Sequence, residues 1–173
     1  GTTFDSVTAT NTGAADGINL DNVTGSLVMN GGSITQNGGS GIAFDLNAGS
    51  ANVSYAGTLT STAANRLIDI TSRTTGTVTL SGNLSGTGTS TGINIASNTG
   101  GTFTLSGTSK TLNTGTNAAV TLTTNSGATI NFSGGGLTIT TTSGTGFNAS
   151  GVGTVTVQGT GNTITTASGI AVN

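Results

Sequence analysis

Apolar residues recur along the chain in short triplets in which two apolar positions flank a polar one, as in Ile18-Asn19-Leu20. Because successive side chains of a strand point to opposite sides, this alternation predicts short strands with one face turned inward. Clusters of turn-forming residues, such as Gly38-Gly39-Ser40-Gly41, separate the triplets. No 11-residue window has the spacing of an amphipathic helix, so we expect no helix.

Three sets of these apolar positions advance together with a period near 25 residues. The first set begins at Ile18, Ile42, Ile68, Ile93, Val120, Phe147 and Ile170. The second set begins at Leu27, Val53, Val78, Phe103, Ile130 and Val155. The third set consists of Ile34, Leu59, Leu84, Leu112, Ile139 and Ile164.

A common period in three sets predicts a coil that gives one strand to each of three parallel sheets. We therefore predict an all-β fold, a right-handed parallel β-helix (β-solenoid) with three sheets and about six coils of ~25 residues, forming a single segment over residues 1–173. The handedness follows from the rule for parallel crossovers. A β-sandwich explains the equal spacing of the three sets less well. A flexible linker, which the Gly and Ser content would suit, explains the regular apolar positions less well.

The composition then narrows the possible functions. The chain has 40 Thr, 31 Gly, 19 Ser and 18 Asn, whereas only 5% of its residues are charged and it contains no His or Cys. Zinc sites, thiol nucleophiles and histidine-based acid–base pairs are therefore excluded. Three basic residues and a net charge of −2 argue against nucleic acid, and no apolar run is long enough for a transmembrane helix. We expect no enzymatic activity, no cofactor and no metal.

One phrase of the repeat resembles a known group of proteins. Residues 76–83 (GTVTLSGN) and 101–108 (GTFTLSGT) are similar to the Thr/Gly/Asn-rich repeats of bacterial autotransporter and filamentous-haemagglutinin-like surface proteins, whose parallel β-helices have the pectin-lyase-like architecture. The resemblance implies secretion and an extracellular or bacterial cell-surface location. It also implies a structural or adhesive role, with self-association, flanking repeats of the same chain, or a host or matrix surface as partners.

Both ends of the chain are expected to be uncapped, because the repeat begins within a second-set strand near Phe4 and stops after a first-set strand. Exposed strand edges invite pairing with further strands. We therefore expect either a slice of a longer repeat protein or a unit that stacks end to end into a filament.

Three carboxylates are candidates for chemistry on the first sheet. Asp21 and Asp45 follow their triplets at the same offset, and Asp69 lies two residues earlier on the next coil. Clustered carboxylates suit acid–base catalysis or a weak cation site, as in polysaccharide-processing enzymes. Without a histidine, we favour a hydrated acidic surface on which Asp69 pairs with Arg66 or Arg73.

Threonine gathers at the outward positions of the second set. A ladder of such residues resembles ice-binding solenoids, and an alternative function is therefore ligand binding, to ice or to a glycan. The third set is equally rich in threonine, which favours the simpler explanation that threonine suits strands. The aromatic residues fall mainly on inward positions, so sugar stacking is unsupported. The candidate ladder consists of Thr77, Thr79, Thr102, Thr104, Thr154 and Thr156.

Overall fold

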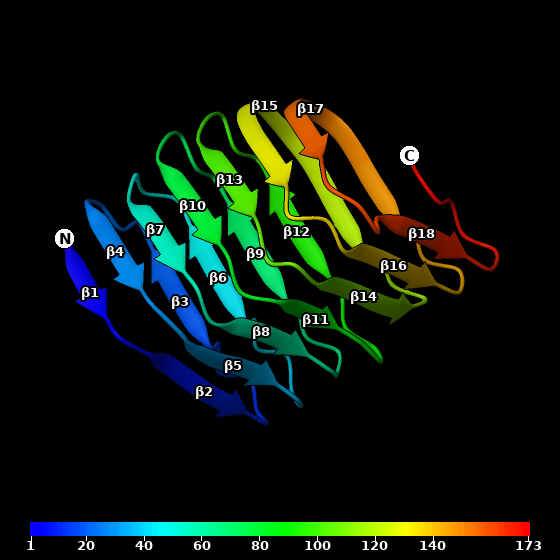
Figure 1. Ribbon diagram of the computed structural model, residues 1–173, viewed down its shortest axis with the longest axis horizontal. Coiled ribbons are helices and arrows are strands. Elements are labelled where there is room, and N and C mark those ends of the chain that lie inside the picture. Colours follow the sequence, from blue (N-terminus) through cyan, green and yellow to red (C-terminus); the bar gives the residue numbers. More distant parts are fainter.

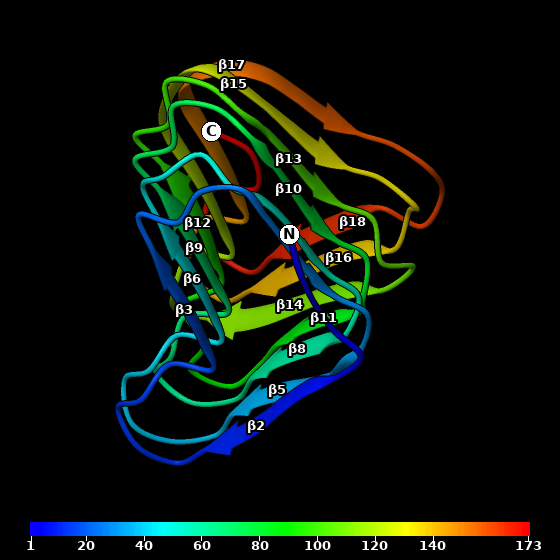
Figure 2. The ribbon, with the colours of Figure 1, turned by 90° about the vertical axis from the view of Figure 1, so that its left-hand side faces the viewer.

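The computed structural model describes all 173 residues and contains eighteen strands and no helix (Figure 1). The strands wind into a rod with three faces, which we call the first, second and third sheets after the three sets of apolar positions (Figure 2). Every strand pairs in parallel with the equivalent strand one coil away, so the predicted β-solenoid is confirmed. The structure contains no helix that could span a membrane.

The third sheet has seven strands in the order β18-β16-β14-β11-β8-β5-β2, so the rod has seven coils rather than the six that we expected. These strands are β2 (Val7–Asn11), β5 (Gly32–Gln36), β8 (Thr58–Ser61), β11 (Leu84–Gly86), β14 (Lys110–Gly115), β16 (Leu137–Thr141) and β18 (Thr163–Thr166).

The first and second sheets are joined into one hydrogen-bonded sheet, because β15 (Val120–Phe132) and β17 (Phe147–Val157) run through the corner between them. The first sheet otherwise consists of β3 (Ile18–Asp21), β6 (Phe44–Asn47), β9 (Ile68–Thr71) and β12 (Ile93–Ala96). The second sheet otherwise consists of β1 (Thr2–Phe4), β4 (Ser26–Met29), β7 (Asn52–Tyr55), β10 (Thr77–Leu80) and β13 (Thr102–Leu105).

The inward side chains stack in columns and form one core of 30 buried apolar residues. The predicted second-set column is confirmed, since Leu27, Val53, Val78, Phe103, Ile130 and Val155 are register partners in successive coils. Burial of these columns is the main favourable contribution to folding, because each coil covers the apolar side chains of the next.

Two predicted positions of the first column are wrong by two residues. Ile18 pairs with Phe44 rather than with Ile42, and Phe147 pairs with Val172 rather than with Ile170. A shift of two residues leaves the same side chains facing inward, so alternation alone does not select between the two registers.

The third column also departs from the prediction in its middle. Leu84 pairs with Lys110, and Leu112 pairs with Gly86. The predicted set therefore passes from one inward column to its neighbour at this point. In consequence, Lys110 takes an inward position that the pattern reserved for an apolar residue.

Both buried cations are bound by backbone carbonyl oxygens and lack a carboxylate partner. The guanidinium of Arg73 donates to Ala48 O at 2.5 Å and to Ala51 O at 2.6 Å. The Lys110 ammonium donates to the carbonyl oxygens of three corner residues, Gly107, Ser133 and Gly135. Burial lowers the pKa of both groups.

The corner between the first and second sheets repeats a left-handed residue in six coils. The residue after each of these positions points inward in the middle coils, where Asn98 Oδ1 accepts from Arg73 N at 2.8 Å and Asn125 Oδ1 accepts from Asn98 N at 3.1 Å. This ladder supplies the buried backbone groups with partners. The left-handed residues are Asn22, Ala48, Ser72, Ser97, Thr124 and Gly151.

Replacing Thr124 by asparagine is expected to raise the free energy of unfolding by about 1 kcal/mol, because a β-branched residue is strained at positive φ and asparagine adopts this conformation readily. Thr124 has a φ of 56° and is exposed, so the change removes no core contact. Urea denaturation followed by circular dichroism measures the difference. The same exchange at exposed Thr138, within β16, should be neutral or destabilising, and a gain at both positions would contradict the explanation.

Candidate functional site

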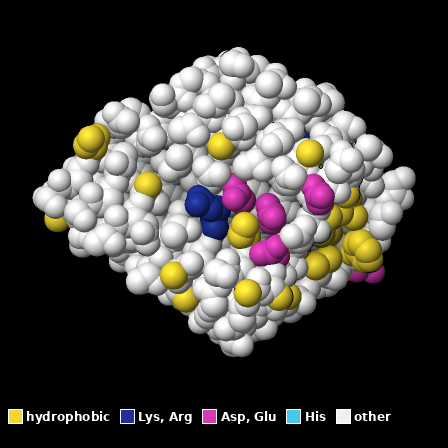
Figure 3. Space-filling view, turned by 180° about the vertical axis from the view of Figure 1, so that it is seen from behind, with side chains coloured by type: hydrophobic (Ala, Val, Ile, Leu, Met, Phe, Trp, Pro, Cys, Tyr) yellow, Lys and Arg dark blue, Asp and Glu magenta, His cyan; other side chains and the backbone are white.

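The acidic surface of the first sheet is built from two adjacent columns of outward side chains. Asp45 pairs in register with Asn19 on one side and with Asp69 on the other. Asp21 pairs with Asn47 instead, so the predicted alignment of Asp21 with Asp45 is wrong, for the same two-residue shift that displaced Ile42. Figure 3 shows the carboxylates gathered beside a basic side chain on this face.

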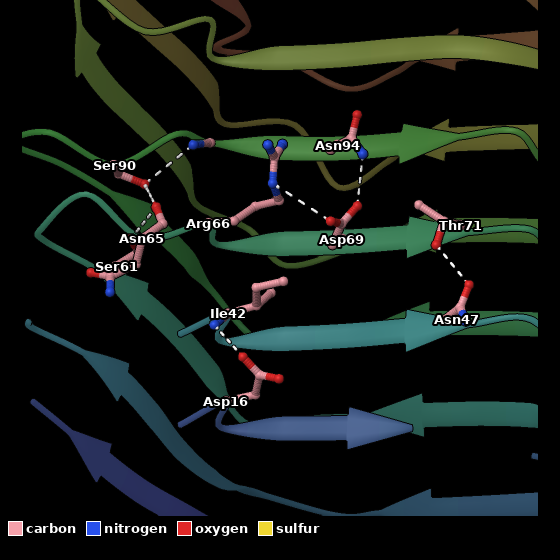
Figure 4. A network of polar contacts seen from close by, with 11 residues as sticks. Asp16, Ile42, Asn47, Ser61, Asn65, Arg66, Asp69, Thr71, Ser90 and Asn94 are labelled. Atoms are coloured by element: carbon pink, nitrogen blue, oxygen red, sulfur yellow. Dashed lines mark hydrogen bonds and ion pairs between the residues drawn. The ribbon is translucent and has the colours of Figure 1, made fainter. Parts of the chain in front are cut away.

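Asp69 is the carboxylate with the most partners. Arg66 Nε lies 3.6 Å from Asp69 Oδ2, and Asn94 Nδ2 donates to Asp69 Oδ1 at 2.7 Å (Figure 4). Of the two arginines predicted as partners, Arg66 is therefore confirmed. Arg73 is wrong, because its side chain is buried at the corner and bound to carbonyl oxygens. The Arg66 pair is partly exposed and contributes little to stability.

A fourth carboxylate, Asp16, belongs to this surface and was missed by the sequence analysis. Its Oδ1 accepts from Ile42 N at 2.7 Å on the next coil, and its Oδ2 accepts from Asn19 Nδ2 at 2.6 Å (Figure 4). Asp16 lies in a corner rather than in a triplet, so the alternation contained no signal for it. Its position just before a strand, where aspartate commonly accepts backbone N–H groups, was the available clue.

Asp45 is the electrostatically unusual member of the cluster. Its pKa is raised to about 6, first by burial and then by the charges of Asp69, Asp16 and Asp21. No hydrogen bond joins its carboxylate to another side chain or to the backbone, whereas Asp16, Asp21 and Asp69 each accept one or more. A raised carboxyl beside an ionised one is an arrangement that acid–base chemistry uses.

The surroundings of this pair do not add to that chemistry. No group of three or more potential metal ligands occurs in the structure. The structure has two hollows, and both are lined without any aspartate. The pair thus lies on an open sheet face that offers no cavity to orient a substrate.

Replacing Asp45 by asparagine is expected to stabilise the chain by about 1–2 kcal/mol at pH 8, because it removes an ionised group held close to other carboxylates. An amide here also has a donor for Asp69, as Asn94 does. The folded pKa is raised, so the native chain binds more protons than the unfolded chain between about pH 4 and pH 6. Its stability should therefore fall as pH rises through this window.

Urea denaturation at a series of pH values from 4 to 8 measures this effect. The gain from Asp45→Asn should be small near pH 4, and the variant should lose most of the pH dependence of the native chain. Asp5→Asn is the matched control, because Asp5 is exposed and lies outside the cluster. A gain that does not vary with pH would contradict the proposed cause.

The threonine ladder of the second sheet has the predicted alignment. Thr77 pairs with Thr102, and Thr79 pairs with Thr104. Thr154 and Thr156 lie two coils beyond Thr102 and Thr104 in the same two columns, as the pairings of β15 with β13 and β17 show. The six candidate residues therefore form two adjacent outward rows.

These rows are not a uniform threonine surface. Asn131 interrupts one row, where it accepts from Thr156 Oγ1 at 2.7 Å and approaches Thr104 Oγ1 at 3.5 Å. Towards the N-terminal end, Ser54 and Val28 occupy the same row. There the surface sinks into a hollow of about 210 Å³ lined by Ser26, Leu27, Val28, Asn52, Val53, Ser54, Thr77 and Thr79.

The third sheet carries an equally regular row, so threonine does not mark one face. Its register partners in successive coils are Thr10, Thr35, Thr60, Ser85, Thr111, Thr138 and Thr163. A surface built to match ice would be concentrated on one flat sheet. The repetition on two sheets is better explained by the strand propensity of threonine.

Comparisons of the chain with protein-family models, with curated proteins and with solved structures found no match.

Proposed function

We propose that the chain is a rigid structural or adhesive β-helix segment of a bacterial extracellular or cell-surface protein. The observation that supports this most directly is the unbroken stack of seven coils around a single core of 30 buried apolar residues. In such a stack each coil is held only by its neighbours, so length is added without changing the cross-section. A stalk or spacer needs this property.

Force along the proposed rod acts on its backbone hydrogen bonds, of which there are 105. In a parallel β-helix the bonds between coils lie along the rod axis, so extension acts on all three sheets together. The nearly uncharged surface opposes close lateral contact only weakly. The bacterial surface location is inferred from the resemblance of residues 76–83 and 101–108 alone.

A spacer function is tested by inserting extra coils. Three additional tandem copies of residues 77–101, which span one repeat from β10 to the start of β13, should lengthen the particle by about 14 Å at constant cross-section. Small-angle X-ray scattering measures both dimensions. Displayed between a cell-surface anchor and an epitope, the longer variant should carry the epitope farther from the cell. Growth in all directions, or turnover of a polysaccharide, would contradict the proposal.

A second candidate function, binding of a neutral glycan, is favoured by the polar hollow of the second sheet. Ser26, Asn52, Ser54, Thr77 and Thr79 present hydroxyl and amide groups there. A glycan array probed with the native chain and with Ser54→Tyr, which fills the hollow, tests this candidate. Thr140→Tyr on the third sheet is the matched control. Binding lost only in Ser54→Tyr would establish the glycan site, and an array without binding would remove it.

Ice binding is tested separately by thermal hysteresis. Leucine substitutions at Thr79 and Thr104 change the rows on the second sheet without touching the core. We expect no hysteresis from the native chain. Hysteresis that these substitutions abolish would establish an ice-binding face instead.

A further inference from the structure

The large apolar side chains that remain exposed lie at the two ends of the rod. Phe4 is 49% exposed in the first coil, and Val157 is 43% exposed in the seventh. Both belong to one inward column of the second sheet, whose members are Phe4, Met29, Tyr55, Leu80, Leu105, Phe132 and Val157. Within the rod each member is covered by its neighbours, so an end residue is exposed because no further coil lies above or below it.

The C-terminal end has a hollow where the next coil would lie. It measures about 300 Å³ and is lined mainly by apolar side chains. Val172, 64% exposed, lies at its rim and continues the first-sheet column from Phe147. The lining residues are Leu137, Phe147, Val157, Asn162, Thr163, Ile164 and Val172. At the opposite end, apolar side chains form a patch on the surface (Figure 3).

The backbone edges of the two ends are complementary by construction. Every internal contact joins the upper edge of one coil to the lower edge of the next in the same parallel register. The seventh coil presents a free upper edge in β17 and β18, and the first coil presents a free lower edge in β1, β2 and β3. Such edges are templates for pairing.

The three sheets agree on the position that a docked coil would take. From the first coil to the last, the columns run from Phe4 to Val157, from Asn11 to Ile164 and from Ile18 to Val172. These spans are 153, 153 and 154 residues. A first coil placed on a seventh coil therefore continues all three sheets at once, with Phe4 over Val157 and Ile18 over Val172.

The charges do not oppose this contact. No charged side chain follows Lys110 in the sequence, and Lys110 is buried. The first coil carries Asp5 and Asp16, and Asp16 is bound by the backbone N–H of Ile42. The seventh coil thus presents an apolar, uncharged surface to whatever covers it.

We propose that a second copy of this chain docks head to tail on the first, its first coil pairing with the seventh coil and its Phe4 filling the hollow beside Val157. This partner rests on the proposed structural function. The two surfaces are different, so the contact is heterologous and each addition exposes a new identical end. Association consequently proceeds to open filaments rather than to closed dimers.

Sedimentation velocity and electron microscopy of the chain, without a tag at either end, test the proposal. The mean mass should rise over a roughly hundredfold range of concentration. Val157→Lys and Phe4→Lys each place a charge in the apolar contact and should weaken association at least about 100-fold. Thr165→Lys adds a charge to an outward, exposed position of the seventh coil and should have little effect. Circular dichroism establishes that each variant is folded.

Mixing the two blocked variants is the decisive measurement. The intact first coil of Val157→Lys chains fits the intact seventh coil of Phe4→Lys chains, so the mixture should form heterodimers that neither variant forms alone. Both free ends of a heterodimer carry an introduced lysine, so growth stops there. A native chain that stays monomeric at all concentrations, or a mixture without heterodimers, overturns the proposal. A monomer that is still a seven-coil rod by X-ray scattering leaves the structural function intact.

Discussion

Replacing Lys110 by methionine is expected to lower the free energy of unfolding by about 3 kcal/mol, although methionine is apolar and similar in length. Lys110 lies in an inward column between Leu84 and Leu137 and is fully buried. Its Nζ donates to the carbonyl oxygens of Gly107, Ser133 and Gly135. Methionine fills the space but leaves these buried acceptors without their donor.

Two effects of opposite sign compete in this substitution. Removing a buried ammonium recovers its desolvation penalty, whereas removing the donor leaves three carbonyl oxygens unsatisfied. We expect the second effect to be larger, because the lysine supplies one hydrogen bond to each of three acceptors at a corner. Arg73 meets the same need at another corner, where it donates to Ala48 and Ala51.

Urea denaturation followed by circular dichroism at pH 7 measures the change for Lys110→Met. Leu84→Met, one coil earlier in the same column, is the matched control and should cost less than about 1.5 kcal/mol, since it conserves volume and leaves no polar group unpaired. If Lys110→Met were as stable as the native chain, desolvation of the ammonium would be the larger effect and the cage of carbonyls would add little.

The sequence predicts which side chains face inward much better than it predicts which residues are neighbours in adjacent coils. Residues 42 to 46 alternate through three apolar positions, so the first-set strand fits equally well at Ile42 or at Phe44. The structure selects Phe44, since the corner before it needs two more residues to turn. Every residue kept its inward or outward direction, but Asp45 and Asp21 changed columns.

Polar residues at inward or corner positions were beyond the pattern for a different reason. Lys110, Arg73 and Asp16 are not apolar, and an alternation of apolar residues contains no information on them. Their positions follow from the carbonyl and N–H groups that tight corners leave unpaired, which are a property of the folded backbone. The spacing of 28 residues from Leu84 to Leu112 was the one visible sign that a residue of another kind occupied the column.

The repeated Leu-Ser-Gly sequence at residues 80–82 and 105–107 leads to the last prediction. Gly82 lies at the corner between the second and third sheets, and a Cβ atom there would lie 1.9 Å from Gly57 O in the preceding coil. The same atom on Gly107 would lie 2.1 Å from Gly82 O. Neither glycine has a positive φ, so glycine is required here by the close approach of successive coils.

Gly82→Ala is therefore expected to lower the free energy of unfolding by about 3 kcal/mol, the upper part of the range for overpacking, because both clashing groups belong to the backbone. Gly13→Ala is the matched control. A Cβ on Gly13 meets no atom within 4 Å, and the change should stay within about 0.5 kcal/mol. Urea denaturation of both variants measures the contrast, and equal losses would contradict the steric explanation.

Hydrogen exchange should locate the damage from Gly82→Ala. Coils interact only with their neighbours, so amide protection should fall most in β7, β8, β10 and β11, on both sides of the clash, and less in β17 and β18. Uniform loss of protection would indicate that the rod unfolds as a single unit. A local loss would mean that the glycine column sets the spacing between coils one contact at a time, which is what a rod needs if further coils are to pair with its ends in the same register.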